Sequence, residues 1–525
     1  MKSSQYWKNR SAKRMYEYHT EADKVADDIA QAYIDSTNYI NNEIEKIFRT
    51  FQIEGGLTES EARELLNNTP GQVKLANLKD YIKQVKDPEK QQTLLNMINS
   101  PAYSYRIKRF ERLQEDIDRQ TRELAEFEQK TTKNHYVQLS GEAYNRTMFD
   151  IQRGIGFGFP FSKMPVSRIE EILKNNWSGQ HFSARIWGRA EDINQTLKEE
   201  LLTQFMTGRS YRKTASEISD RMAVGAYEAR RLVRTESTYI ANSAELESYK
   251  ECGIEQFRFL ATLDMRTSDL CASMDGKVFP VDEGVPGTNI PPLHPWCRST
   301  TVAVIDGAVL SDLKRRARDP ETGKPYLVSA DTTYEEWKKE LDQRFGEGYS
   351  TTKRKMVQNR AKDSKQYQKY IAILGKENLP KSLDEFQNLK YNNGDEWDDL
   401  KYYARNINGR PIEYVKIDRE LLKKGIIKKG KAYPVEDIVI SDWRDHARER
   451  INEINFTEEQ ALKFKENAIA VMRKFPEPET QWNYYSDDGI IGIRHSDGLV
   501  CTIIDKNRYR NETKEILKEM KKWLT

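Results

Sequence analysis

The chain has 525 residues, which at the usual 100 to 200 residues per domain indicates roughly three to five folding units. It carries 85 Lys and Arg against 82 Asp and Glu, a net charge of +3, although charged residues make up 32% of it. This balance excludes a uniformly basic nucleic-acid coat and a purely acidic tail, and the 10% aromatic content is untypical of wholesale disorder.

No apolar run approaches the roughly 18 residues needed to span a bilayer, and the first residues have no apolar signal core. We therefore expect a protein made in the cytosol, without a membrane partner. The four cysteines are too sparse for a disulfide scaffold and fit a reducing compartment. Any special role of these cysteines depends on their spacing.

Residues 1–150 are predicted to form a helical arm or bundle. Apolar side chains recur three or four positions apart on a charged background, as at Ile40 and Ile44. Thr58 with Glu61 three residues later predicts a capping box that opens a short helix. The region offers no catalytic chemistry, so we interpret it as structural.

Residues 151–310 are predicted to be helices followed by short, irregular strands, one of them at 300–304. Ser167 with Glu170 predicts another capping box. Further along the helical part, Arg234 and Glu236 diverge by about 200° around the helix axis and cannot pair with each other. Each of these two side chains is therefore expected to contact a different partner.

Cys271, His294 and Cys297 offer the donor types of a zinc site, and His294 with Cys297 forms an H-x-x-C pair. Asp275 or Asp264 is the candidate fourth ligand. Three ligands at this spacing are less specific than two C-x-x-C pairs. A structural zinc, a packed Cys/His cluster without metal, and a Cys271–Cys297 disulfide formed after oxidation are the alternatives, and a catalytic metal or cysteine is the weakest of the readings.

The same stretch carries a family resemblance. Its motifs are RTEST at 234–238, ATLDMRTSDLC at 261–271, DGKVF at 275–279 and PPLHPWCRSTT at 291–301. Together they resemble the phage head morphogenesis family typified by the F protein of phage Mu, over roughly residues 150–310. The opening SSQYWKNR also resembles the amino-terminal region of minor head proteins from phages of Gram-positive hosts.

The resemblance implies a minor head protein, present in few copies at the portal vertex, that acts in head assembly or in DNA packaging and ejection. The implied partners are the portal protein, a scaffold or major head protein, and phage DNA. The implied locations are the host cytoplasm during assembly and the virion afterwards. Folding rather than chemistry is the implied role of the matching positions, which are Arg234, Glu236, Asp264, Arg266, Cys271, Asp275, Gly276, His294, Cys297 and Arg298.

Residues 311–394 are predicted to be a basic helical linker. Its central part holds a run of basic side chains with one acidic residue, Asp363, among them. A solvated helix face is one interpretation, and contact with a phosphate backbone, without sequence specificity, is the other. The basic residues are Lys353, Arg354, Lys355, Arg360, Lys362, Lys365 and Lys369.

Residues 395–525 are predicted to be a small α+β domain with an antiparallel sheet. The pattern indicates a helix at 442–452, a second helix capped by Thr457 and Gln460, strands near 481–486, 489–495 and 499–504, and a terminal helix. The whole chain is therefore predicted to be a multidomain α+β protein.

His446 and Arg450 are four residues apart on the predicted helix and share a face. A proton-transferring imidazole beside a phosphate-holding guanidinium is the minimum for metal-independent RNA cleavage, and Tyr485, His495 and Thr502 would join from the strands. The segments 445–460 and 484–504 resemble phage-encoded nuclease domains grouped with barnase, EndoU, colicin and RelE toxins. A nuclease carried in the virion is therefore the alternative to a binding module in a structural protein.

Overall fold

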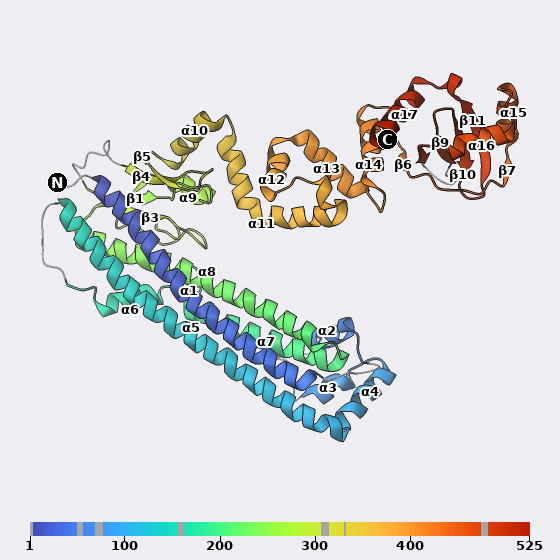
Figure 1. The fold of residues 1–525 in the computed structure, drawn as a ribbon. Helices are drawn as coiled ribbons and strands as arrows, with labels where there is room; N and C mark the ends of the chain where they lie inside the picture. Colours follow the sequence, from blue (N-terminus) through green and yellow to red (C-terminus); the bar gives the residue numbers. More distant parts are fainter. Residues whose placement is uncertain are drawn as a thin grey trace. The chain divides into compact units, whose positions relative to one another are not determined.

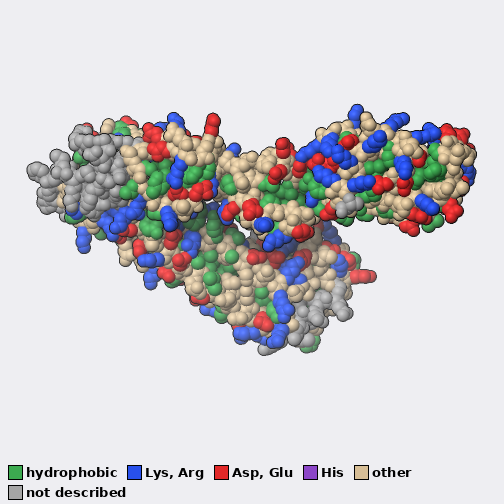
Figure 2. Space-filling model, turned by 45° about the horizontal axis from the view of Figure 1, so that its top comes forward, with side chains coloured by type: hydrophobic (Ala, Val, Ile, Leu, Met, Phe, Trp, Pro, Cys, Tyr) green, Lys and Arg blue, Asp and Glu red, His purple; other side chains and the backbone are tan. Residues whose placement is uncertain are grey.

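The computed structural model describes residues 4–49, 56–68, 77–155, 162–305, 314–329, 332–473 and 481–524. The chain divides into two compact units, Met1–Glu347 and Gly348–Thr525. Helices predominate in both units and small sheets complete them, so the multidomain α+β prediction is confirmed (Figure 1). Acidic and basic side chains alternate over the face shown in Figure 2, in keeping with the small net charge. Among the described residues, no helix has both the length and the apolar character needed to cross a membrane.

Four long helices run side by side in the first unit (Figure 1): α1 (Ser4–Phe48), α5 (Pro101–Ile155), α7 (Phe182–Thr207) and α8 (Tyr211–Glu251). Helix α1 packs against α5 and α8, and α7 packs against the same two helices. Ile40 and Ile44 are fully buried, as their helical spacing predicts. The core of the bundle thus joins the beginning of the chain to residues about 200 positions later.

Short helices flank the bundle: α2 (Glu59–Asn67), α3 (Leu78–Lys83), α4 (Pro88–Asn99) and α6 (Val166–Lys174). The capping box of Thr58 and Glu61 is confirmed at the start of α2. The capping box predicted from Ser167 is wrong, because α6 begins at Val166 with Pro165 in the N-cap position and no side-chain cap. The extended backbone of Pro165 sets this turn, so Ser167 falls inside the first helical turn.

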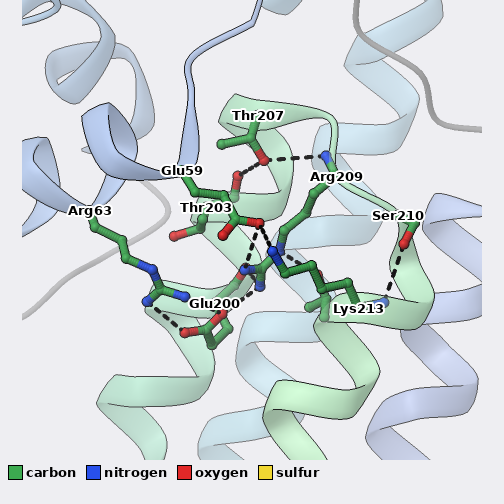
Figure 3. A network of polar contacts seen from close by, with 9 residues as sticks. Glu59, Arg63, Glu200, Thr203, Thr207, Arg209, Ser210 and Lys213 are labelled. Carbon is green, nitrogen blue, oxygen red and sulfur yellow. Dashed lines mark hydrogen bonds and ion pairs between the residues drawn. The ribbon is translucent and has the colours of Figure 1, made fainter. Parts of the chain in front are cut away.

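A polar network fastens α2 to the turn between α7 and α8 (Figure 3). The buried Glu200 of α7 accepts hydrogen bonds from Arg63 of α2, at 2.9 and 3.4 Å, and from Arg209 of the turn, at 2.5 Å. Arg209 also donates to Thr214 at 2.8 Å, and Lys213 pairs with Glu59 at 2.5 Å. The acids and the bases of this network face one another, which favours a structural role for it.

From Gln256 to Ser329 this unit is mainly β structure around one short helix. Strands β1 (Gln256–Leu260), β2 (Val278–Pro280) and β3 (Thr300–Val304) form an antiparallel sheet in the order β2-β1-β3. Helix α9 (Asp269–Met274) precedes β2, and the hairpin β4 (Lys314–Arg318) and β5 (Pro325–Ser329) is followed by α10 (Tyr334–Phe345). The segment expected to be a helical linker thus begins with two strands. In β4, Arg315 and Ala317 are buried, which is the alternation of a strand.

The second unit begins with a small helical cluster: α11 (Tyr349–Leu374), η2 (Lys376–Asn378), α12 (Leu383–Asn392) and α13 (Gly394–Asn406). Phe386 is fully buried at its centre, against Tyr367, Tyr370 and Trp397. The residues after Tyr349 are therefore packed around a core of their own.

A six-stranded sheet forms the rest of the second unit, in the order β6-β8-β9-β10-β11-β7. All neighbouring strands are antiparallel except β11 and β7. Helices α15 and α16 contribute to the apolar cluster on one face, and α14 and α17 to the cluster on the other. The elements are α14 (Ile412–Lys423), β6 (Lys431–Tyr433), β7 (Asp442–Trp443), α15 (Asp445–Glu453), α16 (Glu458–Glu466), β8 (Ala470–Arg473), β9 (Gln481–Tyr485), β10 (Gly489–Arg494), β11 (Leu499–Asp505), η3 (Lys506–Arg508) and α17 (Asn511–Leu524).

Candidate metal centre

Three side chains converge between helix α9 and the loop before strand β3. Cys271 Sγ lies 3.3 Å from His294 Nε2 and 3.6 Å from Cys297 Sγ. In a tetrahedral zinc site the same ligand pairs would be separated by about 3.5 Å and about 3.8 Å. The donors thus have the spacing of ligands to one zinc ion. Both cysteines are free, and their sulfurs are much farther apart than the roughly 2.05 Å of a disulfide.

The ring of His294 is oriented for a ligand role. Its Nδ1 lies 2.7 Å from the carbonyl oxygen of Pro295, so Nδ1–H donates there and Nε2 is the ring nitrogen left for a metal. Nε2 is the atom that faces Cys271 Sγ. A carbonyl acceptor on the second ring nitrogen is the usual support of a metal-bound histidine.

Hydrogen bonds within the cluster give the two cysteines different proton affinities. The Cys271 thiol donates to Cys297 Sγ, which holds the pKa of Cys297 well below its ordinary value. The same contact, together with burial, raises the pKa of Cys271. The hydrogen bond to Cys297 also raises the pKa of His294. Cys297 is therefore the more readily deprotonated of the two thiols, and binding of zinc would release the protons that remain on the pair.

One face of helix α8 holds the loop that carries His294 and Cys297. Thr235 Oγ1 accepts a hydrogen bond from the backbone N–H of Trp296 at 3.1 Å, and Thr238 Oγ1 donates to the carbonyl of Cys297 at 3.0 Å. Trp296 has a left-handed backbone with φ of 62°, which is uncommon for a bulky residue. The contact from α8 therefore stabilises a loop conformation that brings His294 and Cys297 together.

The α8 face continues toward strand β3. Thr300 Oγ1 lies 3.2 Å from Asn242 Oδ1 and 3.3 Å from Glu245 Oε2. The four helix residues, Thr235, Thr238, Asn242 and Glu245, are three or four positions apart and therefore share one side of the helix. The RTEST motif contains the first two of these residues, Thr235 and Thr238, although the sequence alone does not show what the threonines contact.

Neither of the two predicted carboxylate ligands joins the three donors. Asp275 accepts hydrogen bonds from Arg315 at 2.8 Å and from the backbone N–H of Ala261 at 2.7 Å. Asp264 accepts two hydrogen bonds from Arg298. Among the described residues, the group with metal-ligand spacing consists of Cys271, His294 and Cys297. The role of Arg315 has no signal in the sequence, because its partner lies 40 positions away.

Arg234 and Glu236 have separate partners, as their angular separation predicts. Arg234 lies 3.4 Å from Asp23 of α1, and Glu236 accepts a hydrogen bond from Trp177 Nε1 at 2.9 Å. Burial raises the pKa of Glu236. Both motif residues therefore fasten α8 to other segments of the first unit.

The basic residues predicted to contact nucleic acid all lie on α11, but they differ in exposure and in pairing with acids. Arg354 is buried, and Arg360 pairs with Asp384 at 2.5 Å. Lys353 is partly buried. The other four lysines are exposed at helical spacing along one face, and these are Lys355, Lys362, Lys365 and Lys369.

His446 and Arg450 both lie on α15, but each is next to an acid of the same helix. His446 is exposed, and its Nδ1 lies 4.0 Å from Glu449. Arg450 pairs with Glu453 at 2.9 Å. The shared helix face expected from their spacing is therefore present, with Arg450 in an ion pair and His446 exposed beside Glu449.

The three strand residues proposed as catalytic lie on both faces of the sheet. Tyr485 is buried in the apolar cluster of α14 and α17, and burial raises its pKa. Thr502 alternates onto this same face. His495 stacks on Trp482, which belongs to the cluster on the opposite face, with ring centroids 3.9 Å apart.

Comparison with known proteins identifies the segment around the metal centre. Residues 195–302 match the family model described as "Phage Mu protein F like protein". The NAD(+)–arginine ADP-ribosyltransferase EFV of Enterococcus faecalis is 22% identical over 228 residues, which cover 40% of this chain and 44% of that protein. The chain thus aligns with less than half the length of this curated relative. No solved structure matches the chain.

The family match contains all three donors of the metal centre and the α8 face that holds their loop. It confirms the Mu F-like resemblance, whereas the nuclease resemblance of residues 395–525 stays a prediction. The chain therefore contains, at residues 195–302, a module similar to the Mu F-like phage proteins, and this similarity supports a relation to phage heads.

Proposed function

We propose that this protein is a minor head protein that associates with the portal vertex and acts in head assembly or in DNA packaging and ejection. The proposal rests on one observation: the segment that matches the Mu F-like family contains both the Cys271, His294 and Cys297 cluster and the part of α8 that supports it. The proposed partners are the portal protein and a scaffold or major head protein. Assembly would take place in the host cytoplasm, and the finished protein would lie inside the head.

The chemistry of the cluster supports a structural zinc. Cys271 and Cys297 are each 1% exposed, and thiolate sulfur and imidazole nitrogen are the donors that structural zinc sites use. Zinc held by these three side chains would join α9 to the loop before β3 and stabilise the fold there. Three protein donors leave one tetrahedral position for water or for a group from another chain.

The lysine face of α11 supports contact with phage DNA. Lys355 and Lys369 are 14 residues apart, so the face is about 21 Å long at 1.5 Å per residue. The opposite side of the helix is buried against α12 through Asp363 and Tyr367, which leaves the lysines directed away from that core. Such a row of cations binds phosphates without reading the sequence of bases.

Co-purification with virus particles tests the proposed location. One phage would encode the tagged full chain, and a second would encode a tagged chain lacking Gly348–Thr525. Heads and portal complexes would be isolated from cells infected with each. Both chains are expected to remain with the particles, because the Mu F-like module lies in the first unit. Loss of the shortened chain from the particles would show that the first unit is not the anchor.

Cleavage of nucleic acid by the second unit is the alternative function, and the exposure of His446 on α15 favours it. RNA and DNA would be incubated with the full chain, with EDTA in one arm and the His446→Ala variant in another. Cleavage that survives EDTA and disappears in the variant would establish a metal-independent nuclease. Intact nucleic acid in every arm would leave the second unit as a binding module.

A further inference from the structure

Four planar side chains form a continuous row across neighbouring strands of the second unit. The guanidinium carbon of Arg473 on β8 lies 3.6 Å from the ring centroid of Tyr433 on β6 and 3.5 Å from that of Trp482 on β9. His495, directly after β10, stacks on Trp482 with centroids 3.9 Å apart and planes inclined by 27°. A guanidinium and an imidazole this close to the Trp482 ring would overlap if both lay on the same face of it. Arg473 and His495 therefore cover opposite faces of Trp482.

The outer end of this row is open to solvent. His495 is exposed, whereas Trp482 is 2% exposed and lies in the apolar cluster of the sheet. Arg494, the residue before His495, pairs with Asp497 and so closes the hairpin turn beside it. One face of the His495 ring is thus covered by Trp482, and the ring ends the row at the surface.

Two buried N–H groups of the row lack acceptors. Trp482 Nε1 and Arg473 Nε have no hydrogen-bond partner among the described residues. Glu436 accepts from another nitrogen of Arg473 at 3.3 Å, and its side chain is more than half exposed. Buried donors without acceptors are rare in folded proteins, because losing water without a replacement is costly. Because these two atoms are themselves buried, the parts of the row that a ligand can reach are the outer face of His495 and the exposed 24% of the Arg473 side chain.

Positive charge borders the row. Lys431 on the edge strand β6 is the register partner of Arg473, and Lys428 and Lys429 are exposed in the turn just before it. A ligand with a flat π face, acceptor oxygens and negative charge would satisfy all three features. Nucleotides of a single strand have this combination, whereas the bases of a duplex are stacked on one another and cannot reach a protein ring.

We propose that the row Tyr433, Arg473, Trp482 and His495 is a binding site for single-stranded nucleic acid, in which an unpaired base stacks on His495 and the adjoining phosphate is bound by Arg473 and Lys431. The site is separate from the lysine face of α11, which would bind phosphates of either single or double strands. It goes beyond a structural role in the head, and it requires no cleavage.

Binding of fluorescein-labelled 12-nucleotide DNA, RNA of the same sequence, and the corresponding DNA duplex to the full-length protein tests the site by fluorescence anisotropy. His495→Ala is expected to weaken binding of the single strands about tenfold, as the loss of one stacked base predicts. His495→Phe keeps an aromatic face and is expected to retain most of the affinity. Duplex binding is expected to be unchanged in both variants.

Asn507→Ala is the matched control, because it shortens another exposed side chain of the same unit outside the row. Single-strand affinity that falls in His495→Ala, persists in Asn507→Ala and returns in His495→Phe supports the site, and the preferred strand then identifies DNA or RNA as its ligand. Equal affinity of wild type and His495→Ala for both strands would overturn the proposal, and so would the absence of single-strand binding by the wild type. The Lys362→Gln/Lys369→Gln variant, measured alongside, shows separately whether α11 binds.

Discussion

Cys271, His294 and Cys297 lead to a direct prediction about metal content. The purified full chain is expected to contain about one zinc ion, since the three donors match the geometry of a zinc site. Cys297→Ser is expected to lower the content to near zero, because it removes one of the three donors. Elemental analysis by mass spectrometry measures this ratio. Cys501→Ser, at a buried cysteine of strand β11, is the control that should retain the metal.

Asp275 and Arg315 form a buried ion pair. A substitution of Asp275 can therefore distinguish a role in folding from a role as a metal ligand. Asp275→Asn would leave Arg315 buried and uncompensated, so we expect a loss of about 3–5 kcal/mol in the free energy of unfolding. Zinc content of the folded variant should be unchanged. Urea titration and metal analysis check the two results, with the exposed Asp282→Asn as control. Loss of zinc together with retained stability would make Asp275 a ligand.

Glu245 predicts a dependence of stability on pH. Burial raises the pKa of Glu245 from 4.5 to about 7, and Arg14, which could hold the carboxylate charged, is shared with Asp150. Between those pH values the folded state keeps a proton that the unfolded state has released, so stability falls as pH rises. The expected loss from pH 5 to pH 8 is about 3 kcal/mol.

The Glu245→Gln variant would show this loss by comparison, because its amide does not titrate. Relative to that variant, the wild type should become less stable between pH 5 and pH 8, as measured by urea unfolding at both values. The exposed Glu255→Gln is the control and should follow the wild type. A constant difference between wild type and Glu245→Gln would contradict a raised pKa.

At the scale of single elements, helix α11 predicts how salt affects DNA binding. Each phosphate contact contributes about 0.9 to the slope of log affinity against log salt. Replacing Lys362 and Lys369 with Gln should therefore lower the slope for duplex DNA by about two. Lys506→Gln/Lys521→Gln removes the same charge at lysines that pair with acids, and should leave the slope nearly unchanged. An unaltered slope in the α11 variant would indicate a merely solvated helix face.

Local signals predict many elements of this chain because their causes are local. The capping boxes at Thr58 and Thr457 are confirmed, and strands β9, β10 and β11 lie where alternation and turn residues predict them. The helix expected at 442–452 begins at Asp445 instead, because Asp442 and Trp443 pair with strand β11. This pairing with a strand that comes later in the sequence has no local signal. The hairpin β4–β5, by contrast, is a local pairing across residues 319–324 that the helical interpretation of this segment missed.

The candidate site is predictable to a similar degree. Donor types and spacing single out Cys271, His294 and Cys297, because zinc ligands are few in kind and often close in sequence. The fourth position is not predictable, since Asp275 and Asp264 are engaged by arginines through tertiary contacts. The threonines of α8 act through a loop about 60 residues away. Their role becomes visible with the fold.

At the scale of the whole molecule, the two compact units predict two unfolding transitions. Differential scanning calorimetry of the full chain should resolve the two transitions. A chelator should lower the midpoint temperature of the transition of Met1–Glu347, because the zinc donors lie in that unit. Phe386→Ala should lower the other by removing a fully buried ring at a cost of about 3–5 kcal/mol. A chelator that shifts both transitions equally would show that the units unfold together.

The contact between α1 and α8 has a consequence for synthesis of the chain. His19 bonds to Thr238, 219 residues later, and Thr238 in turn bonds to the loop of Cys297. At 5–20 residues per second, a ribosome needs roughly 10–40 s to make the intervening segment. For that time the side of α1 that packs on α8 has no partner from its own chain. Translation that stops before residue 238 would therefore leave an amphipathic helix open to chaperones and proteases.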